Sequence, residues 1–420
     1  MDGIDAVVSG LGRFIAPVLP AGPIRSLVVD GVIAGVGAVV TFVPQIAILF
    51  FFIALMEDSG YLARGAFIMD RLMRGVGLSG RSFIPLLSSF ACAIPGIMAT
   101  RTIDNKRDRL TTILIAPFMS CSARLPVYAL LIGAFIPNRT IAGFLSLPGL
   151  VLFSLYFLGI LVAVLVAWSL KRTALRGRRP LYVMELPPYR LPAWRSVLLT
   201  VRDRAWVFVQ KAGTVILAVS IVLWFLATYP KNPQATRPLE QRLEATETVA
   251  AQAETRGDAA RSAQERARAQ EIHNEIAGVS LRDSFAGHAG RLLEPVIAPL
   301  GFDWKIGIAL LSSFAAREVM VSTMATVYNL GDSDQTSTSL RDKLRTARNP
   351  DTGARAYSPL MAVSLMVFFV LACQCMSTVA VVRRETNSWR WPLFMIVMMN
   401  TLAWAASFAV YQGGKLLGLG

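Results

Sequence analysis

Three cysteines lie inside apolar stretches of this sequence, each close to other groups that can bind a metal ion. Cys92 precedes a Pro-Gly pair, Cys121 stands between Ser120 and Ser122, and Cys375 has hydroxyl side chains one turn further on. A thiolate suits borderline and soft metals such as Fe(II), Zn(II) and Cu(I), whereas oxygen cages suit Mg(II) and Ca(II). Buried cysteine is also an ordinary small apolar residue. The shared surroundings of the three thiols predict a transient path for a soft-leaning divalent cation.

Another cysteine and a few charged residues share these apolar stretches. Cys373 faces another side of the helix that carries Cys375, and we expect it to pack. An ionisable side chain inside a membrane span is costly and by default indicates function. Arg124, Arg317 and Glu318 are such residues. Glu318 is expected either to bind the metal or to pair with Arg124.

Further carboxylates stand at helix ends. Glu57 and Asp58 close the first long apolar stretch, and they either receive the metal at the outer face or merely mark a solvated helix end. Asp70 and Glu294 are expected to have structural roles.

The sequence lacks the motifs of several kinds of metal site and of P-loop nucleotide binding. There is no CxxC pair, no HExxH and no GxxxxGK[ST], and both histidines fall in polar segments. Imidazole-based metal sites and P-loop nucleotide hydrolysis are therefore not expected. No nucleophile–base pair is recognisable either, so the sequence predicts that the chain is not an enzyme, and it predicts no permanently bound cofactor.

The composition predicts how these residues are held. Apolar residues make up 54% of the 420 residues and charged ones 16%, against about 25% charged in soluble proteins. Several uncharged runs reach the roughly 20 residues that a helical span needs, and backbone in lipid must bond internally. We therefore predict an all-α, polytopic membrane protein with broken or re-entrant helices. The runs are 31–56, 82–100, 140–170, 212–229, 356–382 and 391–414.

The net charge of +15 does not indicate nucleic-acid binding. Nine basic and two acidic residues lie between Lys171 and Arg204, in one loop between apolar runs. Such an excess is typical of cytoplasmic loops. Arg101–Arg109 is expected on the same side. Arg383, Arg384 and Arg390 then fall outside, which conflicts with a simple count of four spans per half and points to re-entrant segments.

The sequence also repeats itself. A shift of 224 positions places Leu86–Ala91 on the identical residues Leu310–Ala315, and it places Gly77 on Gly301. Duplicated halves are common in secondary transporters, whose substrate site lies at the repeat interface near the midplane. Pro95 and Gly96 predict a helix break close to Cys92. The sequence leaves open whether 82–103 and 305–330 span or re-enter, and whether the repeats are parallel or inverted.

This repeat gives the predicted organisation. An amphipathic lead-in at 1–26 precedes a first membrane repeat at 27–172. A basic cytoplasmic linker at 173–205 leads to a second repeat at 206–420. Polar insertions at 230–285 and 331–357 interrupt the second repeat, and the first of them is expected to form a solvated helical hairpin.

Several long motifs resemble the membrane portion of the ferrous iron transport protein B family (FeoB). They are Phe42–Gln45 through Glu57–Tyr61, Ile97–Arg101, Pro117–Tyr128, Glu185–Tyr189, Ala316–Val319 and Arg384–Thr386 before Trp389. The two halves resemble the gate modules of that family. Two departures are Ala93, where the family typically has asparagine, and Gln374, where it usually has proline. The cytoplasmic GTP-binding domain with which the family usually begins is not in this sequence.

The resemblance implies Fe(II) transport across the bacterial inner membrane, with Cys92, Cys121 and Cys375 along the path. In this hypothesis Fe(II) loses water near Glu57 and Asp58, passes the three thiols with help from Glu318, and leaves on the basic side. Implied partners are Fe(II), the lipid bilayer, a separate GTP-binding protein, small Feo-type accessory proteins and further copies of the chain. Alternatives that remain open are a permease for another divalent metal or a nucleoside-like solute, and a non-transporting scaffold or sensor.

Overall fold

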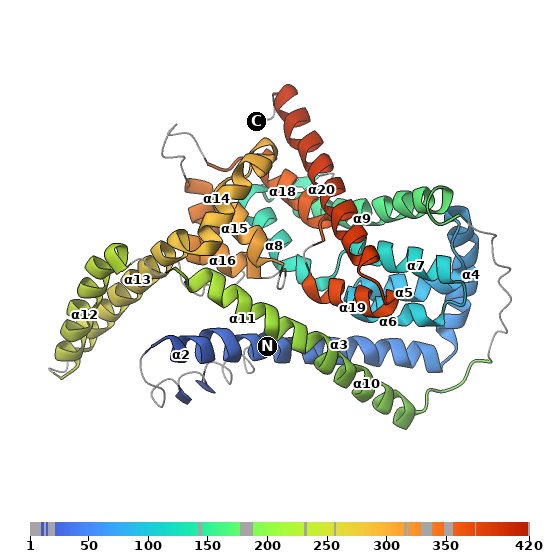
Figure 1. The fold of residues 1–420 in the computed structure, drawn as a ribbon, viewed down its shortest axis with the longest axis horizontal. Coiled ribbons are helices and arrows are strands. Elements are labelled where there is room, and N and C mark those ends of the chain that lie inside the picture. Colours follow the sequence, from blue (N-terminus) through green and yellow to red (C-terminus); the bar gives the residue numbers. More distant parts are fainter. Residues whose placement is uncertain are drawn as a thin grey trace. The chain divides into compact units, whose positions relative to one another are not determined.

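The protein is built almost entirely of helices (Figure 1). The computed structural model describes residues 10–11, 14–15, 22–141, 145–176, 188–230, 233–255, 258–314, 317, 319–328, 338–347, 356–373 and 375–418. Within these ranges, five helices are long and apolar enough to cross a membrane, and a bent helix pair raises the number to six if it forms one span. A two-residue antiparallel ladder joins β1 (Thr140–Ile141) to β2 (Leu145–Ser146). The expected all-α polytopic fold is confirmed.

The helices follow the order expected for two related halves. The first half contains α2 (Pro23–Ser26), a π-helical turn (Leu27–Ile33), α3 (Ala34–Asp58), α4 (Tyr61–Val76), α5 (Phe83–Ser89), α6 (Ala93–Ala99), α7 (Lys106–Ile115), α8 (Leu125–Phe135) and α9 (Leu147–Arg172). The second contains α10 (Trp194–Phe208), α11 (Thr214–Thr228), α12 (Pro233–Thr255), α13 (Ala259–Asp283), α14 (Phe285–Ile297), α15 (Trp304–Ser312), α16 (Val319–Val327), α17 (Thr338–Thr346), α18 (Pro359–Leu371), α19 (Met376–Thr386) and α20 (Arg390–Leu416). The predicted polar hairpin is the pair α12 and α13, which pack together.

Two compact units divide the chain. Unit 1 comprises residues 1–125, 152–221 and 369–404, and unit 2 comprises 126–151, 222–368 and 405–420. Each unit takes segments from both predicted repeats, so the units do not follow the predicted domain boundaries. In particular, unit 1 contains α7 from the first half and α19 from the second.

The backbone repeats at the spacing of the sequence match. Gly77 ends α4 with a φ of 87°, and Gly301 follows α14 and a 3₁₀ turn (Ala298–Leu300) with a φ of 85°. The bonds Leu78 N to Met73 O and Phe302 N to Ile297 O are also 224 positions apart. This Schellman-type ending favours glycine because the left-handed conformation leaves no room for a Cβ atom.

The segment 82–103 folds back on itself within unit 1. Helices α5 and α6 pack side by side, and a Cβ atom on Gly96 would lie 2.0 Å from Ser89 Oγ and 2.7 Å from Pro85 O. At the open end of this hairpin, Arg81 pairs with Asp104. Because both ends meet at the surface, the segment enters and leaves on one side and is re-entrant.

Unit 2 contains a matching hairpin of α15 and α16. Asp303 begins α15 and accepts a bond from the Tyr357 hydroxyl at 2.9 Å. Tyr357 in turn accepts from Tyr328, just after α16, at 2.6 Å. The two ends of this segment therefore also lie together. Apart from Arg317, residues 315–318 at its tip lie outside the described part of the chain.

Contacts within unit 1 assign one face of the membrane and correct two expectations. The Asp58 carboxylate accepts from Arg190 at 3.1 Å and from the Ala193 N–H at 2.6 Å, so α3 ends against the basic linker. If the basic linker is cytoplasmic, Asp58 and its neighbour Glu57 cannot stand at the outer face, and we place them at the cytoplasmic face.

The second correction concerns the arginines at the end of α19. Glu385 pairs with Arg101 and Arg109, which places this end of α19 on the same face as the basic 101–109 segment. If the 101–109 segment is cytoplasmic, Arg383, Arg384 and Arg390 lie at the cytoplasmic face too, and not outside. The re-entrant hairpin at 82–103 removes one crossing from the count of spans, which brings these arginines to the face of the 101–109 segment.

Labelling of introduced cysteines tests this assignment. A maleimide that cannot cross membranes should modify Glu57→Cys in inside-out vesicles and not in right-side-out ones. Arg25→Cys, exposed at the other end of the same helical span, should show the opposite pattern. Modification of Glu57→Cys from the outer side would overturn the assignment.

The hairpin packing makes a second prediction. Gly96→Ala should lower the free energy of unfolding by about 1–3 kcal/mol, because the backbone oxygen of Pro85 cannot move away as a side chain could. Thermal unfolding in detergent, followed by tryptophan fluorescence, measures the loss. Gly75→Ala is the control, since a Cβ atom there meets nothing within 4 Å. Equal melting temperatures for the two variants would contradict the close packing of α5 on α6.

Candidate functional site in the broken helices

Each of the three candidate thiols stands where a helix is interrupted. Cys92, Cys121 and Cys375 are the residues immediately before α6, the 3₁₀ turn Ser122–Arg124 and α19. All three have an extended backbone, and all three are partly buried. Unwound backbone at a helix end can present both its own polar groups and a neighbouring side chain to an ion. The same local structure therefore occurs at all three cysteines.

The first interruption lies slightly ahead of the predicted position. The chain leaves the helix at 90–92, and Pro95 is the third residue of α6. A proline in the first helical turn removes no bond, because that N–H has no intrahelical partner. Pro95 thus begins the second half of the hairpin.

The tip of the hairpin meets the interruption of the next span. Ala91 O accepts from the Ser122 N–H at 3.4 Å and from the Ser122 hydroxyl at 3.1 Å. The interruption before Cys121 separates α7, with a 3₁₀ turn (Ala116–Phe118), from α8. Helix α19, which begins after Cys375, packs against α6. All three thiols therefore lie on elements of unit 1 that are in contact.

The thiols do not form a closed metal cage. Within the described ranges, no group of three or more His, Cys, Asp or Glu side chains is close enough to hold a metal ion. Of the predicted hydroxyl donors, Ser122 is bonded to Ala91 and Ser120 is buried beside Arg124. The arrangement offers separate partial sites along neighbouring interruptions.

Arg124 is fully buried and fills the interruption next to Cys121. Its guanidinium donates to Pro117 O at 2.9 Å, Met119 O at 3.1 Å and Phe118 O at 3.3 Å, and to the Ser120 hydroxyl at 3.4 Å. A buried charge needs several such bonds to offset the loss of water. Here they come from carbonyl groups at the end of a half-helix.

The other candidates have different surroundings. Glu57 is exposed, Asp58 is engaged by the linker, and Glu318 lies outside the described residues. Cys373 is buried, as expected for a packing residue. Asp70 has a structural contact, since it accepts from the Gly80 N–H at 2.8 Å. Of the remaining charged candidates, Glu294 is partly buried and Arg317 is buried.

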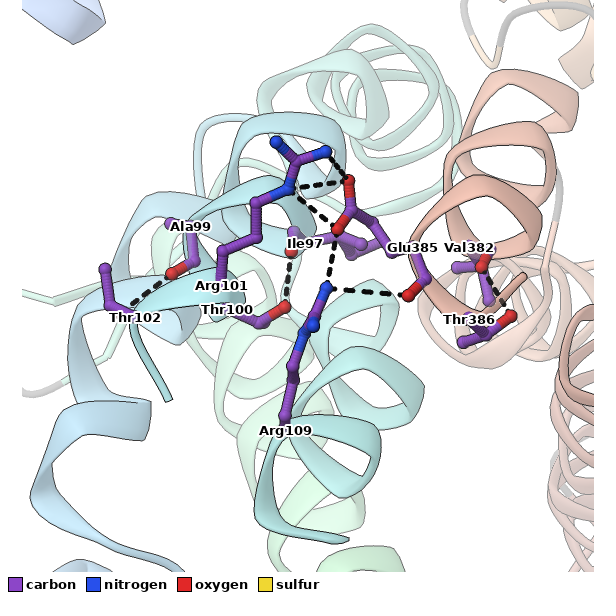
Figure 2. Close-up of polar contacts among 9 residues, drawn as sticks. All are labelled: Ile97, Ala99, Thr100, Arg101, Thr102, Arg109, Val382, Glu385 and Thr386. Carbon is purple, nitrogen blue, oxygen red and sulfur yellow. Dashed lines mark hydrogen bonds and ion pairs between the residues drawn. The ribbon is translucent and has the colours of Figure 1, made fainter. Parts of the chain in front are cut away.

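A charge cluster at the end of α19 was not assigned a role from the sequence (Figure 2). The Glu385 carboxylate is 4% exposed, and it accepts from Arg101 at 2.6–3.1 Å and from Arg109 at 2.7 Å. A hydrogen bond and the charge of Glu385 raise the pKa of Arg101. This carboxylate joins the end of the hairpin, the start of α7 and the end of α19. The available signal was the motif Arg384–Thr386, which places an acid beside a basic residue.

A second buried pair fixes α9 to the same region. Lys171 near the end of α9 donates to the fully buried Asp108 of α7. Both pairs lie where α7 begins, so this end of α7 is bound by charge to α9 and α19.

Comparisons with known proteins support a relationship over the whole chain. The Gate family, described as nucleoside recognition, matches residues 39–135 and 209–389, and the ferrous iron transport protein B C-terminus matches residues 152–204. The chain belongs to the ferrous iron transport protein B family. It corresponds to the membrane part of the family's proteins. No solved structure matches the chain.

Three curated relatives illustrate the extent of the match. The Fe(2+) transporter FeoB of Leptospira interrogans serovar copenhageni is 45% identical over 99% of this chain and 55% of its own length. The Staphylococcus aureus (strain MSSA476) FeoB is 38% identical over 99% of this chain and 52% of its own. A Porphyromonas gingivalis Fe(2+) transport protein A/FeoB fusion is 43% identical over 99% of this chain and 47% of its own. The chain thus spans about half the length of these relatives.

The Glu385 cluster leads to a stability prediction. Glu385→Gln leaves two guanidinium groups without their carboxylate. It should cost about 2 kcal/mol, less than the roughly 3–5 kcal/mol of a fully buried pair, because Arg101 is largely exposed. The thermal unfolding midpoint in detergent measures the effect.

The matched control is Asp203→Asn, which breaks an ion pair whose two side chains are both exposed. It should change the free energy of unfolding by less than about 0.5 kcal/mol. If Glu385→Gln melted like this control, Glu385 would have no role in joining the three elements.

Proposed function

We propose that this chain forms the membrane pathway of an Fe(II) permease in the bacterial inner membrane. The observation that carries the proposal is the contact between the Cys92 hairpin tip and the interrupted span at Cys121. A re-entrant hairpin that reaches a broken helix brings a thiol, hydroxyls and backbone carbonyls into a water-poor region. Thiolate with oxygen donors suits Fe(II) better than it suits Mg(II) or Ca(II).

The ion moves between partial sites. Fe(II) exchanges its water ligands for Cys92, Cys121 and Cys375 in turn, with Ser122 and nearby backbone oxygens as further donors. Ser120, also expected from the sequence as a ligand, is engaged by Arg124 and is left out of the path. Weak coordination at several sites allows the ion to leave as well as to bind. The absence of a closed cage among the described residues is compatible with such a path.

The proposed position of Glu57 and Asp58 on the path differs from the one expected from the sequence. Glu57 and Asp58 lie beside the linker, so they belong to release and not to capture. Of these two, Glu57 is the exposed carboxylate and the one that can receive an ion. Glu318 remains a proposed ligand of unit 2.

Transport also needs a source of energy and accessory proteins. A GTP-binding protein supplied separately or within a longer product drives or gates transport. The fusion name of the Porphyromonas relative suggests a small transport protein A as an accessory partner. Further copies of this chain are a possible assembly, and a binding role for nucleic acid is not proposed.

A second candidate is a permease for a nucleoside-like solute. The Gate family's description as nucleoside recognition is the specific observation in its favour. Competition of radioactive Fe(II) uptake by Mn(II), Zn(II) and nucleosides separates the two. A non-transporting scaffold would give no metal flux in proteoliposomes under any condition.

Cysteine substitutions test the thiol path. Cys92→Ser, Cys121→Ser and Cys375→Ser should each lower the rate of Fe(II) uptake about tenfold or more, which corresponds to about 1.4 kcal/mol of lost stabilisation. Uptake of radioactive iron by cells that lack other Fe(II) importers is the measurement. Cys373→Ala is the control, because its thiol is buried in packing, and it should retain most uptake. Unchanged rates in all three serine variants would remove the thiols from the path.

A further inference from the structure

The guanidinium of Arg124 occupies a place that resembles a cation site. Four oxygen atoms from the consecutive residues Pro117–Ser120 lie within 2.9–3.4 Å of its nitrogen atoms. Three of them are backbone carbonyls at the end of a half-helix, where the helix dipole is negative. Successive carbonyls of this kind replace the hydration shell of ions in selectivity filters. Hard divalent cations such as Ca(II) and Mn(II) prefer such all-oxygen surroundings.

The surrounding helix keeps this oxygen group compact. Gly159 of α9 lies so close that a Cβ atom there would stand 2.8 Å from Phe118 O and 3.5 Å from Ser120 Oγ. The carbonyl and the hydroxyl are therefore held between α9 and Arg124. Arg124 has no exposed surface, so its charge is an internal part of the interruption.

The two halves differ at this position. The spacing of 254 residues that relates Cys121 to Cys375 places Thr378 where the first half has Arg124. Thr378 is buried and carries no charge, and it is the third residue of α19 after Met376 and Ser377. The related interruption before Cys375 is thus not filled by an arginine from the equivalent position.

We infer that Arg124 is a specificity-determining residue that acts as a fixed cation and keeps hard divalent ions out of the interruption at Cys121. With the oxygen atoms occupied, the donor left for a passing ion is the adjacent thiol. An ion with affinity for sulfur can use this position, and an ion that needs an oxygen cage cannot. This inference rests on the proposed metal permease, and it adds the residue that excludes competing ions.

The direct test is metal binding to the purified full chain. Arg124→Ala should create one Mn(II) site per chain, detected by electron paramagnetic resonance titration, and Ca(II) should compete for it. The unchanged chain should bind at least tenfold more weakly. Arg139→Ala, which removes an exposed arginine, is the matched control and should behave like the unchanged chain. If Arg124→Ala proves unstable, Arg124→Gln replaces it in the same titration.

A second measurement separates selectivity from a purely structural role. Arg124→Lys keeps the charge but offers fewer donors to the four oxygen atoms. In proteoliposomes it should raise the ratio of Mn(II) to Fe(II) flux about tenfold, whereas general damage lowers both fluxes together. An unchanged ratio, or no Mn(II) site in Arg124→Ala or Arg124→Gln, overturns the inference. If the unchanged chain moves no metal, the proposed function fails, and the Mn(II) titration still decides the role of Arg124.

Discussion

The fold depends on one constraint: backbone that unwinds inside hydrocarbon must find its hydrogen-bond partners within the protein. Arg124 donates hydrogen bonds to the carbonyls of 117–119, and Ser122 donates to Ala91 O at the hairpin tip. Each bond pairs a carbonyl that would otherwise be unsatisfied and would destabilise the span. The same bonds fix the thiols of Cys92 and Cys121 on neighbouring strands of unwound chain. The hydrogen bonds that satisfy the unwound backbone therefore also place the two thiols.

The charge pairs at one face set the positions of these interruptions. Glu385 and Asp108 are buried acids that each accept from basic side chains of other elements. They bind α6, α7, α9 and α19 where these begin or end. Together with the buried apolar side chains of these short half-helices, such pairs define where their inner ends lie. The arrangement links a charged surface to the apolar interior through rigid segments.

Sequence alone predicted much of this structure. Apolar runs matched most of the membrane helices, but the span 106–135 was not among them and the run 82–100 forms the hairpin. The 224-residue repeat matched the paired turns at Gly77 and Gly301. The cysteines were singled out by a predicted break and by polar neighbours, and each stands just before a helix or a 3₁₀ turn. The exact interruption at 90–92 was missed, because proline usually indicates a break but is also well suited to a first turn. Pairing of Glu385 with Arg101 spans 284 residues, so the motif Arg384–Thr386 drew attention to the acid but did not identify its partner. The contact of Asp58 with the linker could not be foreseen either, because the two segments are about 130 residues apart.

Helix α19 has a mechanical consequence. It runs as an uninterrupted rod from the thiol of Cys375 to the carboxylate of Glu385, about 15 Å at the usual rise per residue. A rod of this length does not bend appreciably, so any turn of its surface end is passed to its inner end by the same angle. A change in the pairing of Glu385 with its two arginines would therefore be transmitted along α19 to the backbone that carries the thiol of Cys375.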